Sequence, residues 1–111
     1  MSLQSLAPAS LDSLLALITD RLVAEFQPLK IILFGSYARG DADQNSDIDL
    51  LVIFSELANK RARTIEILGC LSDLPVAKDV VITTPKEIAE YGHLVGTVLR
   101  PALRDGRVIY G

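Results

Sequence analysis

The stretch KIILFGSYARGDADQNSDIDLLVIF, residues 30–54, decides the fold of this chain. Its two apolar runs, residues 30–34 and 47–54, are bounded by turn-forming or charged residues, and they predict two buried β-strands. The stretch also holds four aspartates, two glycines and two serines, although most connections need only about four to six residues. Asp47 and Asp49 stand directly against LLVIF. Carboxylates at the mouth of a buried sheet are costly unless another group compensates for their charge.

Helical periodicity occurs on both sides of this stretch. Apolar residues at three- and four-residue steps predict an amphipathic helix over residues 11–26. A second helix is predicted over residues 57–71, with Lys60, Arg61 and Arg63 toward water. The residues expected to form its buried stripe are Leu57, Ile65, Leu68 and Leu71.

The last third of the chain continues the alternation of strands and helices. DVVIT (79–83) is a third strand, and residues 84–87 match a capping box with proline at the first helical position. Gly92 and Gly96 are expected to break the helix that follows, and RVIY (107–110) to form a last short strand. The predicted fold class is therefore α/β (α+β), a small mixed β-sheet flanked by helices.

The composition fits a single domain over residues 1–111. Half of the residues are apolar, and the formal net charge is −3. Because the chain lacks a basic surplus, we expect no direct nucleic-acid partner. The single cysteine, Cys70, cannot form an internal disulfide. The sequence shows no signal peptide and no apolar run of membrane-spanning length, so we expect a cytoplasmic protein with no membrane partner.

The paired aspartates and the preceding Gly-Ser suggest a metal and phosphate site. Side chains alternate along a strand, so Asp47 and Asp49 should point to one face, two rises of ~3.3 Å apart. Such like charges repel unless a cation lies between them, and Mg²⁺ prefers carboxylate and phosphate oxygens. Gly35 permits a close backbone approach, while Ser36 and the amides after it could hold phosphate oxygens. The sequence contains no P-loop motif.

Ten residues separate Gly35-Ser36 from Asp47-Ile48-Asp49. This spacing resembles the signature of the DNA polymerase β-like nucleotidyltransferase superfamily, and Ala38-Arg39-Gly40 fits it too. The stretch is similar in particular to the minimal, stand-alone MNT-type nucleotidyltransferases of prokaryotes. The resemblance covers about residues 30–54 and implies a polymerase β-like nucleotidyltransferase fold.

The resemblance also implies roles for individual residues. Asp47 and Asp49 would hold two Mg²⁺ ions, and Asp79, which opens the third strand, would be the third metal-binding and catalytic carboxylate. Gly35 and Ser36 would bind the triphosphate of ATP.

Arg39 has two readings. It could reach the nucleotide phosphates, or it could tie its loop to Asp41 or Asp43. The sequence does not decide between these two interpretations.

The implied reaction is transfer of AMP, or another NMP, to a hydroxyl group. The chain is too short for the second, acceptor-binding domain of antibiotic nucleotidyltransferases, so we expect the acceptor on another molecule. Minimal family members often accompany a HEPN-domain protein, and some are antitoxins that adenylylate it. Two alternatives stay open: a non-catalytic antitoxin that masks its partner, and a small-molecule nucleotidyltransferase. A homo- or hetero-oligomer is compatible with each of them.

Overall fold

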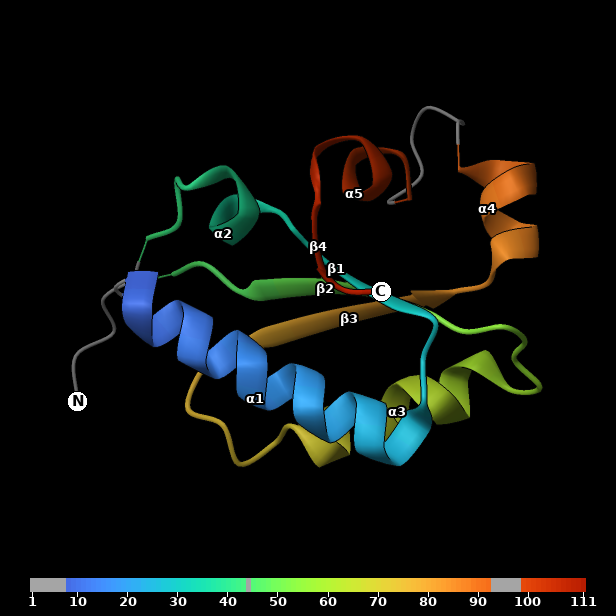
Figure 1. Ribbon diagram of the computed structural model, residues 1–111, viewed down its shortest axis with the longest axis horizontal. Helices are drawn as coiled ribbons and strands as arrows, with labels where there is room; N and C mark the ends of the chain where they lie inside the picture. The colour runs from blue at the N-terminus through green and yellow to red at the C-terminus, as the bar shows by residue number, and fades with distance from the viewer. Residues whose placement is uncertain (1–7, 44, 93–98) are drawn as a thin grey trace.

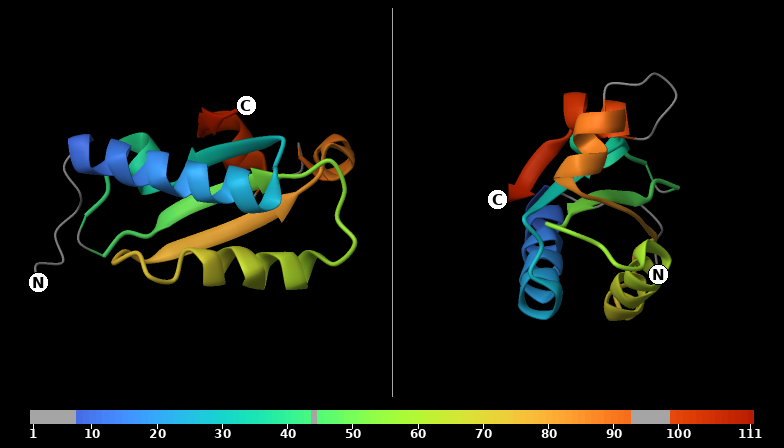
Figure 2. Two further views of the ribbon diagram at one scale, coloured as in Figure 1. Left: turned by 60° about the horizontal axis from the view of Figure 1, so that its bottom comes forward. Right: turned by 90° about the vertical axis from the view of Figure 1, so that its right-hand side faces the viewer.

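The computed structural model describes residues 8–43, 45–92 and 99–111. A four-stranded sheet is covered on one face by α1 and α3, while α4 and α5 lie on the other face (Figure 1, Figure 2). The short helix α2 follows the end of β1. The elements in chain order are α1 (Pro8–Phe26), β1 (Lys30–Phe34), α2 (Ser36–Arg39), β2 (Ile48–Ile53), α3 (Lys60–Cys70), β3 (Lys78–Thr83), α4 (Pro85–Tyr91), α5 (Leu99–Asp105) and β4 (Arg107–Tyr110).

The sheet is mixed, as the sequence predicts, with the strand order β3-β2-β1-β4. Strand β1 pairs antiparallel with both β2 and β4, whereas β2 and β3 run parallel. The predicted strands 30–34 and 107–110 are confirmed. The other two differ from prediction by a residue at their ends, because β2 covers Ile48–Ile53 and β3 begins at Lys78.

Strand β2 lies at the centre of the fold and is buried on both faces. Ile48, Leu50 and Val52 join the core beneath α1 and α3. Leu51 and Ile53 join a second core beneath α5. This double burial explains the unbroken apolar run LLVI, which is typical of a strand covered on both sides.

The predicted stripe of α3 is wrong in part. The helix begins at Lys60, after Asn59, whose side chain accepts a hydrogen bond from the Ala62 amide at 3.0 Å. The predicted stripe residues Ile65 and Leu68 are 60% and 36% exposed, respectively. The α3 residue that is fully buried in the core is Ile67, and Leu71 and Leu74 continue this core beyond the helix.

Contrary to the prediction, Arg63 does not simply point toward water. Its guanidinium carbon lies 5.4 Å from the ring centroid of Phe26 and 5.3 Å from that of Phe54. These distances are those of cation–π contacts. Arg63 therefore links the end of α1, the start of α3 and the segment that follows β2.

The C-terminal elements follow the sequence signals where the structure describes them. Thr84 caps α4 by accepting a hydrogen bond from the Glu87 amide at 3.3 Å, which confirms the capping box. Gly92 ends this helix as predicted, whereas Gly96 lies outside the described residues. Within the described part of the chain, no helix combines the length and apolarity needed to cross a membrane.

Gly106, between α5 and β4, offers a test of this packing. A Cβ atom there would overlap the backbone oxygen of Ala102 and the side chain of Ile32. We expect Gly106→Ala to lower the free energy of unfolding by roughly 1–3 kcal/mol, because the core must shift to accept the methyl group. Gly69 on α3 is the matched control, since nothing lies within 4 Å of its added Cβ. Gly69→Ala should raise stability by about 0.5–1 kcal/mol through helix propensity. Urea unfolding of both variants measures the effects, and equal signs would contradict the packing described.

Candidate active site

Asp49 and Asp79 occupy the same level of the sheet. In the parallel pair β2–β3, Asp49 is the register partner of Asp79, and neighbouring strands are roughly 4.8 Å apart. Their alternation with Leu50 and Val80, which belong to the core beneath α1 and α3, puts both carboxylates on the opposite face, that of α5. The structure therefore brings together two of the three predicted carboxylates from separate strands.

Asp47 stands one residue before β2, outside the strand, and its side chain is exposed. Its charge nevertheless acts on Asp49. Burial raises the pKa of Asp49 above its ordinary value, and the negative charges of Asp79 and Asp47 raise it further. The positive charge of Arg39 opposes this shift. All three aspartates therefore share one electrostatic environment.

Gly35 lies against the carboxylate of Asp49. It directly follows Phe34, which is the register partner of Asp49 in the antiparallel pair β1–β2. The φ angle of Gly35 is 75°, and a Cβ atom there would overlap the Asp49 carboxylate oxygen Oδ2. Both the backbone conformation and the close approach therefore require glycine.

The turn after Gly35 forms the single-turn helix α2. The amides of Ala38 and Arg39 both donate to the Gly35 carbonyl at 3.1 Å, and Gly40 closes the turn in a left-handed conformation. First-turn amides, here those of Ser36 and Tyr37, have no partner within the helix and can bind an anion. The predicted phosphate-binding segment thus begins beside Asp49.

Arg39 is exposed and forms an ion pair with Asp41, with 3.2 Å between Nε and Oδ2. The structure thus shows the loop-tying reading of Arg39. Arg39 is exposed at the C-terminal end of α2, the single-turn helix that begins at Ser36.

The donor set fits a hard divalent cation. Two register-paired carboxylates and a flanking third one offer oxygen ligands, and Mg²⁺ commonly takes one or two carboxylates together with phosphates and water. No ready-made group of three or more acidic, histidine or cysteine side chains is gathered for a metal among residues 8–43, 45–92 and 99–111. The fit therefore rests on the donor chemistry and on the shared face.

A surface hollow of about 730 Å³ lies elsewhere, between α1 and α3. Its lining includes Asp20, Glu25, Glu66 and Cys70. Since α1 and α3 cover the face opposite to that of Asp49 and Asp79, this hollow is separate from the carboxylates, whose chemistry marks the better candidate site.

Sequence reasoning did not single out Lys78. This residue begins β3 and directly precedes Asp79. Burial lowers the pKa of its ammonium group. Its adjacency to Asp79 was the signal in the sequence that could have pointed to it.

The contact between Gly35 and Asp49 can be tested with a second glycine of the same conformation. Gly40 has a φ angle of 83° but nothing within 4 Å of an added Cβ. Gly40→Ala should cost about 1–2 kcal/mol of stability, from backbone strain alone. Gly35→Ala should cost roughly 1–3 kcal/mol more, because its methyl group also displaces Asp49. Urea unfolding compares them, and equal costs would show that the carboxylate does not rest on Gly35.

The charge of Asp49 should destabilise the metal-free protein. Because the raised pKa means that the folded state binds this proton more tightly than the unfolded chain, the free energy of unfolding falls as pH rises through the shifted pKa. Asp49→Asn should therefore be more stable than the wild type at pH 7 in EDTA. This gain should shrink as the pH is lowered toward about 4, where the unfolded group is also half protonated. Urea unfolding across this range measures it.

Asp20→Asn is the control for that experiment, since Asp20 is exposed on α1, on the other side of the sheet. Its effect should stay within about 0.5 kcal/mol throughout. An Asp49→Asn variant less stable than the wild type at pH 7 would contradict the electrostatic description.

The sequence is similar to those of several known proteins. A family model described as "Nucleotidyltransferase domain" matches residues 15–104. Two relatives from Methanocaldococcus jannaschii are each named "Putative protein adenylyltransferase". One is 37% identical over 54 residues, which are 49% of this chain and 54% of that protein. The other is 61% identical over 33 residues, 30% of this chain and 22% of that protein. The match thus spans about half of the first relative and less of the second.

Solved structures show the same fold. A crystal structure of a "putative nucleotidyltransferase" from Sulfolobus solfataricus has a TM-score of 0.57 at 24% identity, covering 85% of this chain and 75% of that one. A chain of the toxin–antitoxin MntA-HpeT, in a mutant with two aspartates changed to glutamates, has a TM-score of 0.57 at 22% identity and covers 90% and 71%. Because the family model spans β1, β2 and β3, and with them all three aspartates, this chain belongs to the nucleotidyltransferase domain family.

Proposed function

We propose that this protein is a Mg²⁺-dependent nucleotidyltransferase that moves AMP from ATP to a hydroxyl on a partner protein. The observation that carries the proposal is the register of Asp49 with Asp79, on one face and beside Gly35. Membership of the nucleotidyltransferase domain family supports the reaction class. The names of the relatives, protein adenylyltransferases, support a protein acceptor.

The partner we propose is a HEPN-type toxin, with this chain as its antitoxin. The toxin–antitoxin MntA-HpeT, which shares the fold, supports a toxin partner. The HEPN identity and a tyrosine acceptor rest on the resemblance of FGSYARGDADQNSDIDLLVIF to MNT-type proteins.

In this reaction the acceptor oxygen forms a bond to the α-phosphorus, and the bond from that phosphorus to the leaving pyrophosphate breaks. Two Mg²⁺ ions held by Asp47, Asp49 and Asp79 would supply the positive charge that stabilises the attacking and leaving oxygens. Ser36 and the first amides of α2 orient the triphosphate. Arg39 can exchange Asp41 for a phosphate oxygen, because the ion pair is exposed.

Asp79 accepts the proton of the attacking hydroxyl. A tyrosine hydroxyl loses its proton only around pH ~10, so it needs such a base near neutral pH. Asp79 suits this task because it is exposed at the start of the edge strand β3, where an acceptor can approach. Asp49, half-buried between strands β1 and β3, suits the more fixed role of metal ligand.

The transfer can be tested by intact-mass measurement. The protein is incubated with the product of the adjacent reading frame and Mg²⁺–ATP, and the partner should gain the mass of one adenylyl group. Asp49→Asn should abolish the gain. Asp79→Ala should lower turnover by roughly 10²–10⁴-fold while weakening ATP binding much less, since its main contribution belongs to the transition state. Asp20→Asn serves again as the control that keeps full activity.

The other outcomes separate the alternatives. A tight complex that neutralises the partner without any mass gain would replace the proposal with a masking antitoxin. Modification of an aminoglycoside, with the partner protein unchanged, would replace it with a small-molecule transferase.

A further inference from the structure

The position of Asp79 in the sheet follows from the way the chain enters β3. Strand β3 is an edge strand with β2 as its neighbour. The loop before it, residues 71–77, meets β2 where the Ile48 amide donates to the Ala77 carbonyl at 2.9 Å. A slip of this loop would move Asp79 away from Asp49, because a one-residue shift turns each side chain to the other face.

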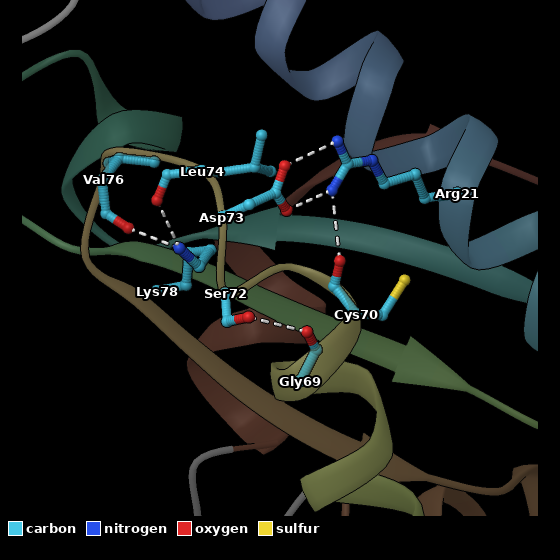
Figure 3. A network of polar contacts seen from close by, with 8 residues as sticks. All are labelled: Arg21, Gly69, Cys70, Ser72, Asp73, Leu74, Val76 and Lys78. Atoms are coloured by element: carbon cyan, nitrogen blue, oxygen red, sulfur yellow. Dashed lines mark hydrogen bonds and ion pairs between the residues drawn. The ribbon is translucent and has the colours of Figure 1, made fainter.

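The side chain of Lys78 forms hydrogen bonds with the backbone of this loop. Its Nζ donates to the Leu74 carbonyl at 2.9 Å and to the Val76 carbonyl at 2.7 Å, as Figure 3 shows. Pro75 lies between these two acceptors and has no amide proton of its own. The ammonium group thus bonds two carbonyls on either side of Pro75, immediately before the strand starts.

A second clamp fastens the same loop to α1. The guanidinium of Arg21 forms a bidentate pair with the Asp73 carboxylate and donates to the Cys70 carbonyl at 3.1 Å (Figure 3). This clamp is the more exposed one, since the Asp73 side chain is 64% exposed. The bonds of Arg21 join the loop to α1, whereas the bonds of Lys78 lie within the last residues of the loop before β3.

Lys78 acts on the side of the sheet away from the site. It alternates with Asp79 and shares its face with Val80 and Ile82, which belong to the core beneath α1 and α3. Its donors are directed to the loop carbonyls rather than to the face that carries Asp49.

From this geometry we infer that Lys78 is a positioning residue, which holds Asp79 level with Asp49 by bonding the Leu74 and Val76 carbonyls. The inference rests on the proposed function for the role of Asp79. It assigns no contact between Lys78 and the nucleotide.

The test compares Lys78→Met with Lys78→Arg, which keeps donors for the carbonyls, and with Lys86→Met, a control on the exposed surface of α4. In Lys78→Met, amide hydrogen exchange of residues 76–80 should speed up by about tenfold or more, because both hydrogen bonds of the ammonium group are lost, with the urea midpoint little changed. Lys78→Arg should restore most of the protection, and Lys86→Met should behave as the wild type. Unchanged exchange in Lys78→Met would overturn the inference.

A second measurement asks whether Lys78 acts through Asp79. The affinity for Mn²⁺ in the presence of ATP, followed by electron paramagnetic resonance, should fall about tenfold in Lys78→Met, as for other supporting residues of a metal site. In the Asp79→Asn background, the same substitution should have no effect on this affinity. An equal loss in both backgrounds would overturn the inference in favour of direct contact with the nucleotide.

These results are separable from those of the proposed function. Hydrogen exchange tests the clamp even in a protein that moves no AMP or binds no metal. Transfer by the wild type together with unaffected exchange in Lys78→Met would sustain the proposed function and reject the positioning role. Should Lys78→Met not fold, Lys78→Gln, whose shorter side chain cannot reach both carbonyls, makes the same comparison.

Discussion

The carboxylate of Asp49 rests on the backbone of Gly35, and the candidate site is arranged around this contact. The antiparallel pairing of Phe34 with Asp49 brings the end of β1 to the start of β2. A side chain at position 35 would occupy the volume of the carboxylate, so the chain must turn there with glycine. The same turn starts α2, whose first amides then begin beside Asp49. One steric constraint thus places the carboxylate of Asp49 beside the turn that begins α2.

One face of β2 contributes to the larger core of the fold, and the other carries the candidate site. Toward α1 and α3, Ile48 and Leu50 are fully buried in the larger core. Asp49 lies between these two residues in the sequence, so its side chain points to the other face of the sheet, toward α5. Fixed neighbours on both sides hold the backbone of Asp49 in place, although its charge is unfavourable where it lies. Burial and the charges of Asp79 and Asp47 all raise its pKa, so the core must outweigh this cost in the metal-free protein.

Local patterns in the sequence predict the strands of the sheet and the turn at Gly35 well, because strand alternation and turn residues act over a few positions. They fail where contacts between distant segments determine which side chains are buried or paired. Which face of α3 meets the sheet depends on packing, so Ile65 was expected inside and is exposed, while Ile67 is buried. The rings around Arg63 come from α1 and from the residue that follows β2, and no spacing in the sequence links them. The alignment of Asp79, rather than Lys78, with Asp49 likewise depends on the register of β3 against β2, which pairs residues far apart in the sequence.

The charge balance of the site supports the proposed dependence of nucleotide binding on a cation. The protein carries a net charge of −3, and the negative charges of Asp47 and Asp79 act on Asp49 near the start of β2. Arg39 opposes their effect on Asp49, yet it is exposed and already paired with Asp41. A triphosphate approaching these carboxylates would meet repulsion at short range. A divalent ion removes this repulsion because it attracts both the carboxylates and the phosphates, so the acidic site would bind nucleotide and metal together more readily than either alone.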